Sequence, residues 1–259
     1  MNKNKPLILI SNDDSISANG IKILVEIMAK IGEVVVVAPD SPQSGKGHAI
    51  TLDQPLRISS STRFGNEVTA YKCSGTPADC IKFGKRFILK DRKIDLVVSG
   101  INHGVNSSIS VIYSGTMSAA IEAAIEGIPA IGFSLCDHSL EADFSHVEPF
   151  VLAIAQKVLD GNLPKGIALN VNIPKKSTED IKGIKFCRQA KAVFREIFHE
   201  RNDPFGKPYF WVDGYLENND TMGGTDEDAL KENYVSIVPV QYDLTAYAVL
   251  EELNDWKFN

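Results

Sequence analysis

The chain has 259 residues, 44% of them hydrophobic and 23% charged, as in an ordinary globular protein with a substantial buried core. Its formal net charge of −6 argues against a general binder of nucleic-acid duplexes or membrane surfaces, because both partners need a basic face. The first apolar run, Leu7–Ile10, is too short for a signal peptide or a membrane span, and no later run is long enough, so we expect a cytoplasmic protein.

The first part of the chain alternates buried-strand runs with segments of helical periodicity. Leu7–Ser11 and Val34–Ala38 are apolar and nearly continuous, which is typical of strands buried on both faces. Apolar residues at helical spacing between them predict a helix that ends before Gly32. Further along we expect loops at Asp40–Gly47 and Ser59–Thr62, and a polar loop that runs from the end of the fifth strand to Tyr113. The further strands expected are two weak ones near His48–Leu52 and Val68–Cys73, and then Ile94–Ser99, Pro129–Phe133 and Ile167–Ile173. The further helices expected are one that begins at Pro77, Ser114–Glu126 and Val147–Leu159.

This order of strands and helices predicts an α/β fold, a doubly wound and mostly parallel sheet in three α/β/α layers of the Rossmann-like type. The rhythm holds over about residues 1–180 and is lost in about 181–259. There, Phe205–Tyr215 and Tyr234–Val240 are strand-like, and Pro239 suggests an edge strand. We therefore expect one domain spanning 1–259, with a C-terminal β-hairpin arm that builds oligomers.

Polar loops follow three of the predicted strands. They are Ser11–Ser15, Ala38–Gly45 and Gly100–Asn106. Ligands of open parallel sheets bind beyond the carboxyl ends of the strands, so these three loops should meet on one edge of the sheet.

The adjacent carboxylates Asp13 and Asp14 indicate a cation in this place, because two neighbouring negative charges repel unless a positive charge compensates them. Hard cations prefer carboxylate, hydroxyl and amide oxygens, and Ser44 and Asn102 can supply the neutral ones. The alternative is that Asp13 only caps the next helix while Asp14 faces solvent.

A second group, Tyr113-Ser114-Gly115-Thr116, stands at a predicted helix start, where N–H groups, hydroxyls and the positive helix end favour a phosphate. The plainer alternative is a serine cap. A metal beside a phosphate site suggests hydrolysis, with the cation polarising the phosphoryl oxygens and orienting a water molecule.

At these residues the chain resembles the survival protein E (SurE) family of metal-dependent 5′-nucleotidases. The matching motifs are SNDD at Ser11–Asp14, AP…QSG at Ala38–Gly45, GTPADC at Gly75–Cys80, SGIN.G.N at Ser99–Asn106, YSGT at Tyr113–Thr116 and GTD..A….YVSI.P…DLTA from Gly224 to Ala246. Each motif is short, but their order and spacing make the resemblance specific.

The resemblance implies hydrolysis of nucleoside 5′-monophosphates by attack of a metal-bound water. It implies one divalent cation per subunit, Mg²⁺ or Mn²⁺ with Ca²⁺ as a further possibility in crystals, and a homodimer or homotetramer formed through the late hairpin. The implied metal ligands are Asp13, Asp14, Ser44 and Asn102, the implied catalytic residues are Asp13, Asp14 and Asn106, and the implied phosphate contacts are Asn106, Ser114, Gly115 and Thr116.

Two positions depart from the family pattern. Ser15 replaces the usual glycine after the aspartate pair, and Ser107–Ser110 lacks the usual glycine and aspartate. The Ser107–Ser110 departure leaves open a catalytically degenerate, nucleotide-binding regulatory protein as the alternative function, because fold alone does not guarantee function.

Among the histidines, His103 follows Asn102 and is a candidate general acid or phosphate contact, or else a supporting histidine. His48 is more consistent with a structural role. The aromatic residues of Phe205–Trp211 could stack on a base, or pack between subunits.

Three other classes of protein fit poorly. A response-regulator receiver needs a phosphoacceptor aspartate where this chain has Ser99-Gly100, and a haloacid-dehalogenase-type phosphatase needs DxD where it has NDDS. A dinucleotide-binding oxidoreductase needs GxGxxG after the first strand, and that motif is missing from the sequence there.

Overall fold

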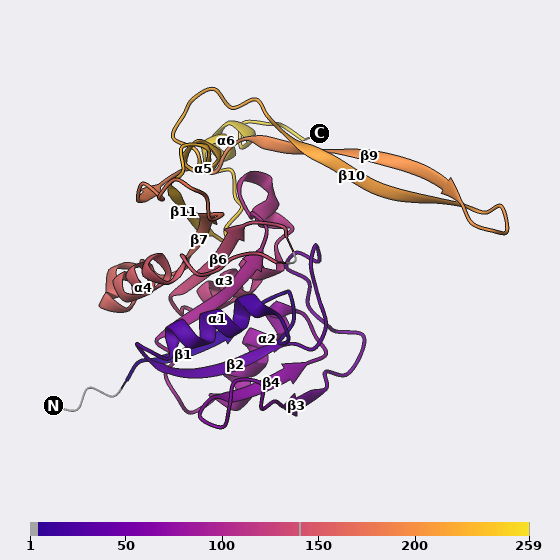
Figure 1. The fold of residues 1–259 in the computed structure, drawn as a ribbon. Helices are drawn as coiled ribbons and strands as arrows, with labels where there is room; N and C mark the ends of the chain where they lie inside the picture. The colour runs from indigo at the N-terminus through magenta and orange to yellow at the C-terminus, as the bar shows by residue number, and fades with distance from the viewer. Residues whose placement is uncertain (1–4, 140, 259) are drawn as a thin grey trace.

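A nine-stranded sheet forms the centre of the part of the chain that the structure, a computed structural model, describes: residues 5–139 and 141–258 (Figure 1). Its strands are β1 (Leu7–Ser11), β2 (Glu33–Pro39), β3 (Ile58–Ser60), β4 (Thr69–Cys73), β5 (Leu96–His103), β6 (Ala130–Cys136), β7 (Ile167–Pro174), β8 (Ile184–Phe186) and β11 (Val235–Gln241). The helices are α1 (Asn19–Met28), α2 (Pro77–Phe83), α3 (Gly115–Ile125), α4 (Glu148–Lys157), α5 (Asp226–Lys231) and α6 (Tyr247–Leu253), with π-helical turns at Gly84–Ile88 and Val158–Asn162 and a 3₁₀ turn at Ser108–Ile112.

The strand order is β3-β4-β2-β1-β5-β6-β7-β11-β8, and the strands from β4 to β7 in this order are parallel. The chain moves outward from β1 through β2 to β4, then returns to the other side of β1 at β5. This reversal creates a topological switch point between β1 and β5, where open parallel sheets bind their ligands. The predicted doubly wound α/β fold is confirmed.

Helices cover both faces of the sheet and bury the apolar strands. Ile8 and Ile10 of β1 belong to the core that α1 and α4 cover, whereas Leu7 and Leu9 belong to the core under α2 and α3. Alternate side chains of a strand point to opposite faces, so the apolar sequence LILI fills both cores at once. The resulting layers are helix, sheet and helix.

Several segments differ from the expectation drawn from the sequence, among them Gly100–His103, which was expected in a loop but continues strand β5. His48–Leu52 forms no strand, because the side chains of the Gly75–Asp79 turn bind its backbone instead. The Thr76 hydroxyl donates to Ala49 O at 2.7 Å, and the N–H of Thr51 donates to the Asp79 carboxylate at 3.1 Å. Conversely, part of the predicted loop Ser59–Thr62 belongs to the short edge strand β3, which pairs with β4 through backbone groups alone and leaves little trace in the sequence.

Pro239 does not mark the outermost strand, as the sequence suggested. Its strand β11 pairs with β7 on one side and with β8 on the other, and β8 is the edge. However, β8 reaches only Val235–Ile237, so the side of Pro239 that lacks an N–H has no strand next to it.

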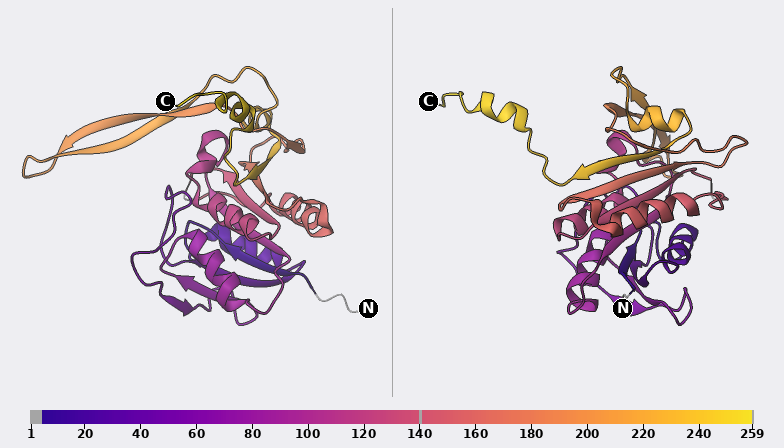
Figure 2. Two further views of the ribbon diagram at one scale, coloured as in Figure 1. Left: turned by 180° about the vertical axis from the view of Figure 1, so that it is seen from behind. Right: turned by 90° about the vertical axis from the view of Figure 1, so that its left-hand side faces the viewer.

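The predicted arm is a long hairpin of β9 (Ala192–Asn202) and β10 (Pro208–Asn218), which projects from the body (Figures 1 and 2). Phe205 was expected within a strand, but it lies in the turn at the tip, where its N–H donates to the Asp203 carboxylate at 2.8 Å. Helix α6 buries none of its residues and stands away from the sheet in the right-hand view of Figure 2.

Helix α1 packs unusually close to β5 at Gly20. A Cβ atom at this position would lie 1.9 Å from the backbone oxygen of Ile101, the residue before Asn102. Only glycine permits this approach, which keeps the end of β5 against the start of α1.

We predict that Gly20→Ala lowers the free energy of unfolding by about 2 to 3 kcal/mol, because the added methyl group must displace backbone rather than a flexible side chain. Urea denaturation followed by circular dichroism measures the change. Asn19→Ala is the control, since Asn19 is exposed in the same turn and its replacement should change stability little. Equal effects of the two substitutions would contradict the packing argument.

Candidate functional site

The three polar loops predicted to meet do come together around the end of β1. The backbone N–H of Gln43, one residue before Ser44, donates to Asp13 O at 2.7 Å. The backbone N–H of His103 donates to the Asp14 carboxylate at 3.2 Å. Two hydrogen bonds thus tie the loop after β2 and the last residue of β5 to the aspartate pair at the switch point.

Asp13 is a buried carboxylate with an exposed fraction of only 3%. Its Oδ1 accepts a hydrogen bond from the Thr116 hydroxyl at 2.5 Å. Gly115 packs directly against it, since a Cβ atom there would lie 2.6 Å from the Asp13 Cβ. The pKa of Asp13 is raised to about 6, chiefly because the carboxyl group is buried; the hydrogen bond from the Thr116 hydroxyl opposes this rise, and the charge of Asp14 adds to it.

Asp14 is more open and contacts His103. The imidazole Nδ1 lies 3.4 Å from the Asp14 Oδ2, and the ring packs edge-on against Phe144 with 5.0 Å between centroids. The hydrogen bond to Asp14 raises the pKa of His103, and partial burial opposes the rise. His103 is therefore placed beside the aspartate pair, where it orients Asp14.

The donor set around the aspartates suits a hard divalent cation. Within residues 5–139 and 141–258, neither carboxylate has a lysine or arginine partner. The Asn102 amide nitrogen donates to the backbone oxygen of Gly104 at 2.9 Å, and no described residue donates to its Oδ1, which remains available as a ligand. Ser44 is exposed on its loop. Two carboxylates and neutral oxygen donors without a counter-charge fit Mg²⁺, Mn²⁺ or Ca²⁺.

The start of α3 faces the same place. The Ser114 hydroxyl accepts a hydrogen bond from Met117 N at 3.1 Å. It therefore caps the helix, which is the alternative that we gave to a direct contact with phosphate. The Thr116 hydroxyl is taken by Asp13. The hydroxyls of this turn therefore serve the fold, and the first-turn N–H groups are what the helix offers to an anion.

Asn106 is buried, with an exposed fraction of 7%, and its side-chain nitrogen donates to the Ser134 hydroxyl of β6 at 2.9 Å. Ser134 was not among the predicted site residues, because its only signal in the sequence is a polar residue within an apolar stretch. Asn12 was not among them either; its amide nitrogen donates to Ser15 O at 2.8 Å and closes the turn that carries the aspartates.

His48 does not join the aspartates. Its Nε2 lies 2.9 Å from the Glu122 carboxylate, which also pairs with Lys82 at 2.6 Å. Burial raises the pKa of Glu122, but these two partners outweigh burial and leave the pKa below its usual value. This arrangement confirms the structural role that we favoured for His48.

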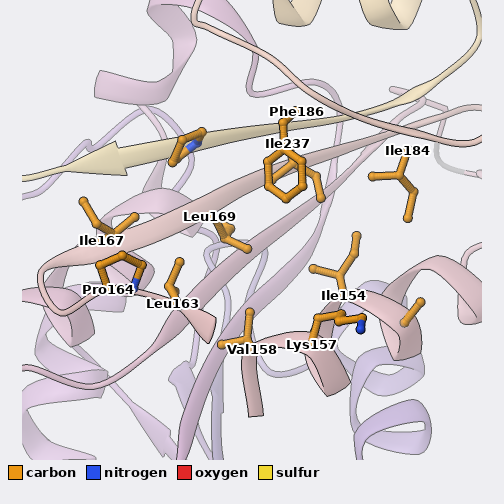
Figure 3. A pocket seen from close by; sticks show the side chains of 12 residues that line it. Ile154, Lys157, Val158, Leu163, Pro164, Ile167, Leu169, Ile184, Phe186 and Ile237 are labelled. Carbon is orange, nitrogen blue, oxygen red and sulfur yellow. The ribbon is translucent and has the colours of Figure 1, made fainter. Parts of the chain in front are cut away.

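A largely apolar groove lies elsewhere in the described part of the chain. It holds about 600 Å³ between α4 and the strands β8 and β11, where Ile154 and Val158 face Phe186 and Ile237 (Figure 3). None of the predicted site residues lines it.

Each departure from the family pattern includes a serine with positive φ: Ser15 at +86°, and Ser108, within Ser107–Ser110, at +51°. The Ser15 hydroxyl accepts one hydrogen bond, from Ser17 N at 3.2 Å. The buried Ser108 hydroxyl donates to Ala190 O at 2.9 Å and accepts from Ala192 N at 3.1 Å, where the arm begins. Ser108 thus fastens the Asn106 loop to the arm in a way that glycine could not.

We predict opposite effects from the same substitution at these two positions. Ser15→Gly should raise the free energy of unfolding by about 0.5 to 1 kcal/mol, because glycine accepts positive φ without strain. Ser108→Gly should lower it by about 1 to 2 kcal/mol, because two buried hydrogen bonds are lost. Urea denaturation measures both changes in the free energy of unfolding. If the two changes had the same sign, either the strain at Ser15 or the hydrogen bonding of Ser108 would be refuted as an explanation.

Comparison with known proteins agrees with the motifs. The family model described as Survival protein SurE matches residues 8–196. The proteins named 5′-nucleotidase SurE from Cytophaga hutchinsonii and Christiangramia forsetii are 62% and 57% identical to the chain, over 98% and 100% of both lengths respectively. The crystal structure of SurE protein from Aquifex aeolicus superposes with a TM-score of 0.82 at 40% identity, covering 96% of this chain and 98% of that one. With its motifs, its fold and these relatives in agreement, the chain belongs to the SurE family.

Proposed function

We propose that the protein is a divalent-cation-dependent 5′-nucleotidase, which hydrolyses nucleoside 5′-monophosphates to nucleoside and phosphate. The observation that carries this proposal is the buried Asp13 carboxylate, which lies beside Asp14 without a basic partner among the described residues and against the first turn of α3. A site for a cation beside a site for an anion suits a phosphate ester. The names of the two bacterial relatives support the same activity.

In the proposed site Asp13, Asp14, Ser44 and Asn102 hold one Mg²⁺ or Mn²⁺ per subunit. The bound cation supplies Lewis-acid polarisation of the phosphoryl group. Asn106 and the N–H groups of Ser114–Thr116 bind the phosphate oxygens and orient the ester. Asp13, Asp14 and Asn106 are thus the catalytic residues of this proposal: the two aspartates bind the cation, and Asn106 contacts the phosphate.

His103 has a defined place in this proposal. Asp14 engages its Nδ1, so Nε2 is the nitrogen left for a phosphate oxygen or for the leaving oxygen of the nucleoside. Because Asp14 favours the protonated ring, His103 suits donation of a hydrogen bond to either oxygen.

We predict that phosphate release from a panel of nucleoside monophosphates stops in EDTA and returns when Mg²⁺ or Mn²⁺ is added. Asp13→Asn and Asp14→Asn should each lower kcat/KM by at least about 100-fold with the fold intact, because each removes a charged ligand. Asp40→Asn is the matched control. Asp40 is an exposed carboxylate directly after β2, and its replacement should change kcat/KM little.

Near-normal turnover in both aspartate variants would refute the ligand assignment. A wild-type protein that binds nucleotides but releases no phosphate with any cation would favour the alternative, a nucleotide-binding regulatory protein.

We also propose a cytoplasmic homodimer or homotetramer built through the β9–β10 arm. The arm exposes large apolar side chains on both strands, among them Phe198 and Trp211 at 66% each. Such a surface is costly in water and typical of subunit contacts. No helix in the described part of the chain is long and apolar enough to span a bilayer.

We predict that Phe198→Ser combined with Trp211→Ser shifts the protein to a smaller assembly. The two changes remove exposed apolar area from the arm and leave the nine-stranded sheet unaltered. Size-exclusion chromatography with light scattering gives the mass. Arg201→Ala, an exposed polar change on the same arm, is the control. An unchanged mass in the double variant would exclude the arm as the main contact.

A further inference from the structure

Strand β7 carries two buried asparagines in a place where the fold calls for apolar residues. It lies between β6 and β11, and its residues Leu169, Val171 and Ile173 fill the core under α4. Asn170 and Asn172 point to the opposite face with exposed fractions of 1% and 0%. Burying two amides costs free energy unless each polar atom finds a partner, so their partners show what they are for.

Both asparagines bind the backbone of Asn106. Asn106 N donates to the Asn172 Oδ1 at 2.8 Å, and the Asn170 Nδ2 donates to Asn106 O at 2.7 Å. Two side chains therefore satisfy both backbone groups of one loop residue, as a neighbouring strand would in a sheet.

The polarity of this network leaves one arrangement of the two amides. The backbone N–H of Asn106 can only donate and its oxygen can only accept, so the Oδ1 of Asn172 and the Nδ2 of Asn170 must face them. The remaining atoms then meet as donor and acceptor, with Asn172 Nδ2 donating to Asn170 Oδ1 at 3.3 Å. Flipping either amide would place a donor against a donor, or an acceptor against an acceptor, at two of these contacts.

The side chain of Asn106 is held as well, because its Nδ2 donates to the Ser134 hydroxyl. Its backbone and one amide hydrogen are thus fixed by β6 and β7, which leaves the second amide hydrogen and Oδ1 for a ligand. A residue held at three points has little freedom left to lose on binding.

We propose that Asn170 and Asn172 are positioning residues, which set Asn106 in place to bind the phosphate. The proposal rests on the proposed function, in which Asn106 contacts that group. It assigns the two asparagines to phosphate affinity and turnover rather than to cation binding, because neither asparagine has a hydrogen bond to a proposed cation ligand, and those ligands come from the ends of β1, β2 and β5.

The test compares Asn172→Ala with Ser236→Ala. Ser236 lies directly opposite Asn172 in the β7–β11 register, is fully buried, and its hydroxyl has no hydrogen-bond partner among the described residues. The control therefore removes a polar group from the same layer without touching Asn106. Affinity for Mn²⁺ alone and for inorganic phosphate in the presence of Mn²⁺ is measured by calorimetry, together with kcat/KM for a nucleoside monophosphate and the thermal midpoint.

Asn172→Ala should weaken phosphate binding and lower kcat/KM by about 10-fold or more, as expected for a displaced binding group, and leave Mn²⁺ affinity unchanged. Ser236→Ala should change neither affinity. A double-mutant cycle supplies the decisive readout. Asn106→Ala should cost about 100-fold in kcat/KM, and adding Asn172→Ala to it should cost little more, because nothing is left to position. If Asn172→Ala does not fold, Asn172→Ser and Asn170→Ser replace it in the same cycle.

Equal phosphate affinity in Asn172→Ala and Ser236→Ala, with an active wild-type protein, would overturn this inference and leave the proposed function standing. The inference would also be overturned if Asn172→Ala lowered kcat/KM as much in the Asn106→Ala variant as it does in the wild-type protein. A wild-type protein without cation-dependent turnover and without phosphate binding would overturn the proposed function and this inference together.

Discussion

The burial of the Asp13 carboxylate is the constraint on which the rest of the site depends. A buried negative charge without a basic partner is costly, and its pKa is raised to about 6. The surrounding structure accommodates it with a hydroxyl from Thr116, with the N-terminal turn of α3 and with the small residue Gly115, where any side chain would collide with it. These contacts hold the carboxylate at the switch point, and a divalent cation would supply the missing positive charge.

The loop from Asn102 to Ser108 connects this centre to the rest of the molecule. One end leaves β5 beside Asp14, its middle lies on β6 and β7 through Asn106, and its far end is fastened to α5 and to the beginning of the arm. There, Ser108 N donates to the buried Asp226 carboxylate at 2.7 Å, and Ala190 N donates to the other oxygen of the same carboxylate at 2.9 Å. The phosphate-binding part of the proposed site and the proposed subunit contact therefore share one hydrogen-bonded base.

The presence of a serine with positive φ at position 108 has a physical explanation in this base. Positive φ is unfavourable for serine, but its hydroxyl bonds to the backbone of Ala190 and Ala192. The neighbouring Ser107 hydroxyl binds the carboxylate of Glu227. Acidic side chains from α5 thus stand at this loop, which lacks the aspartate usual in the family. The departures change how the loop is held, while Asp13, Asp14 and Ser44 stay in their loops and Asn102 stays at the end of β5, where these segments meet at the switch point.

The sequence by itself determined the buried parallel strands, the loops that follow them and the family. Continuous apolar runs and short motifs are local signals, and the carboxyl ends of parallel strands must share one edge of the sheet. Only the tertiary structure decided features that depend on partners distant in the chain. The His48–Leu52 segment forms no strand because Thr76 and Asp79 satisfy its backbone. Asn170 and Asn172 are polar because a loop more than sixty residues away lies on them. Local propensity cannot register such contacts, since the two bonded groups meet only after the sheet has formed.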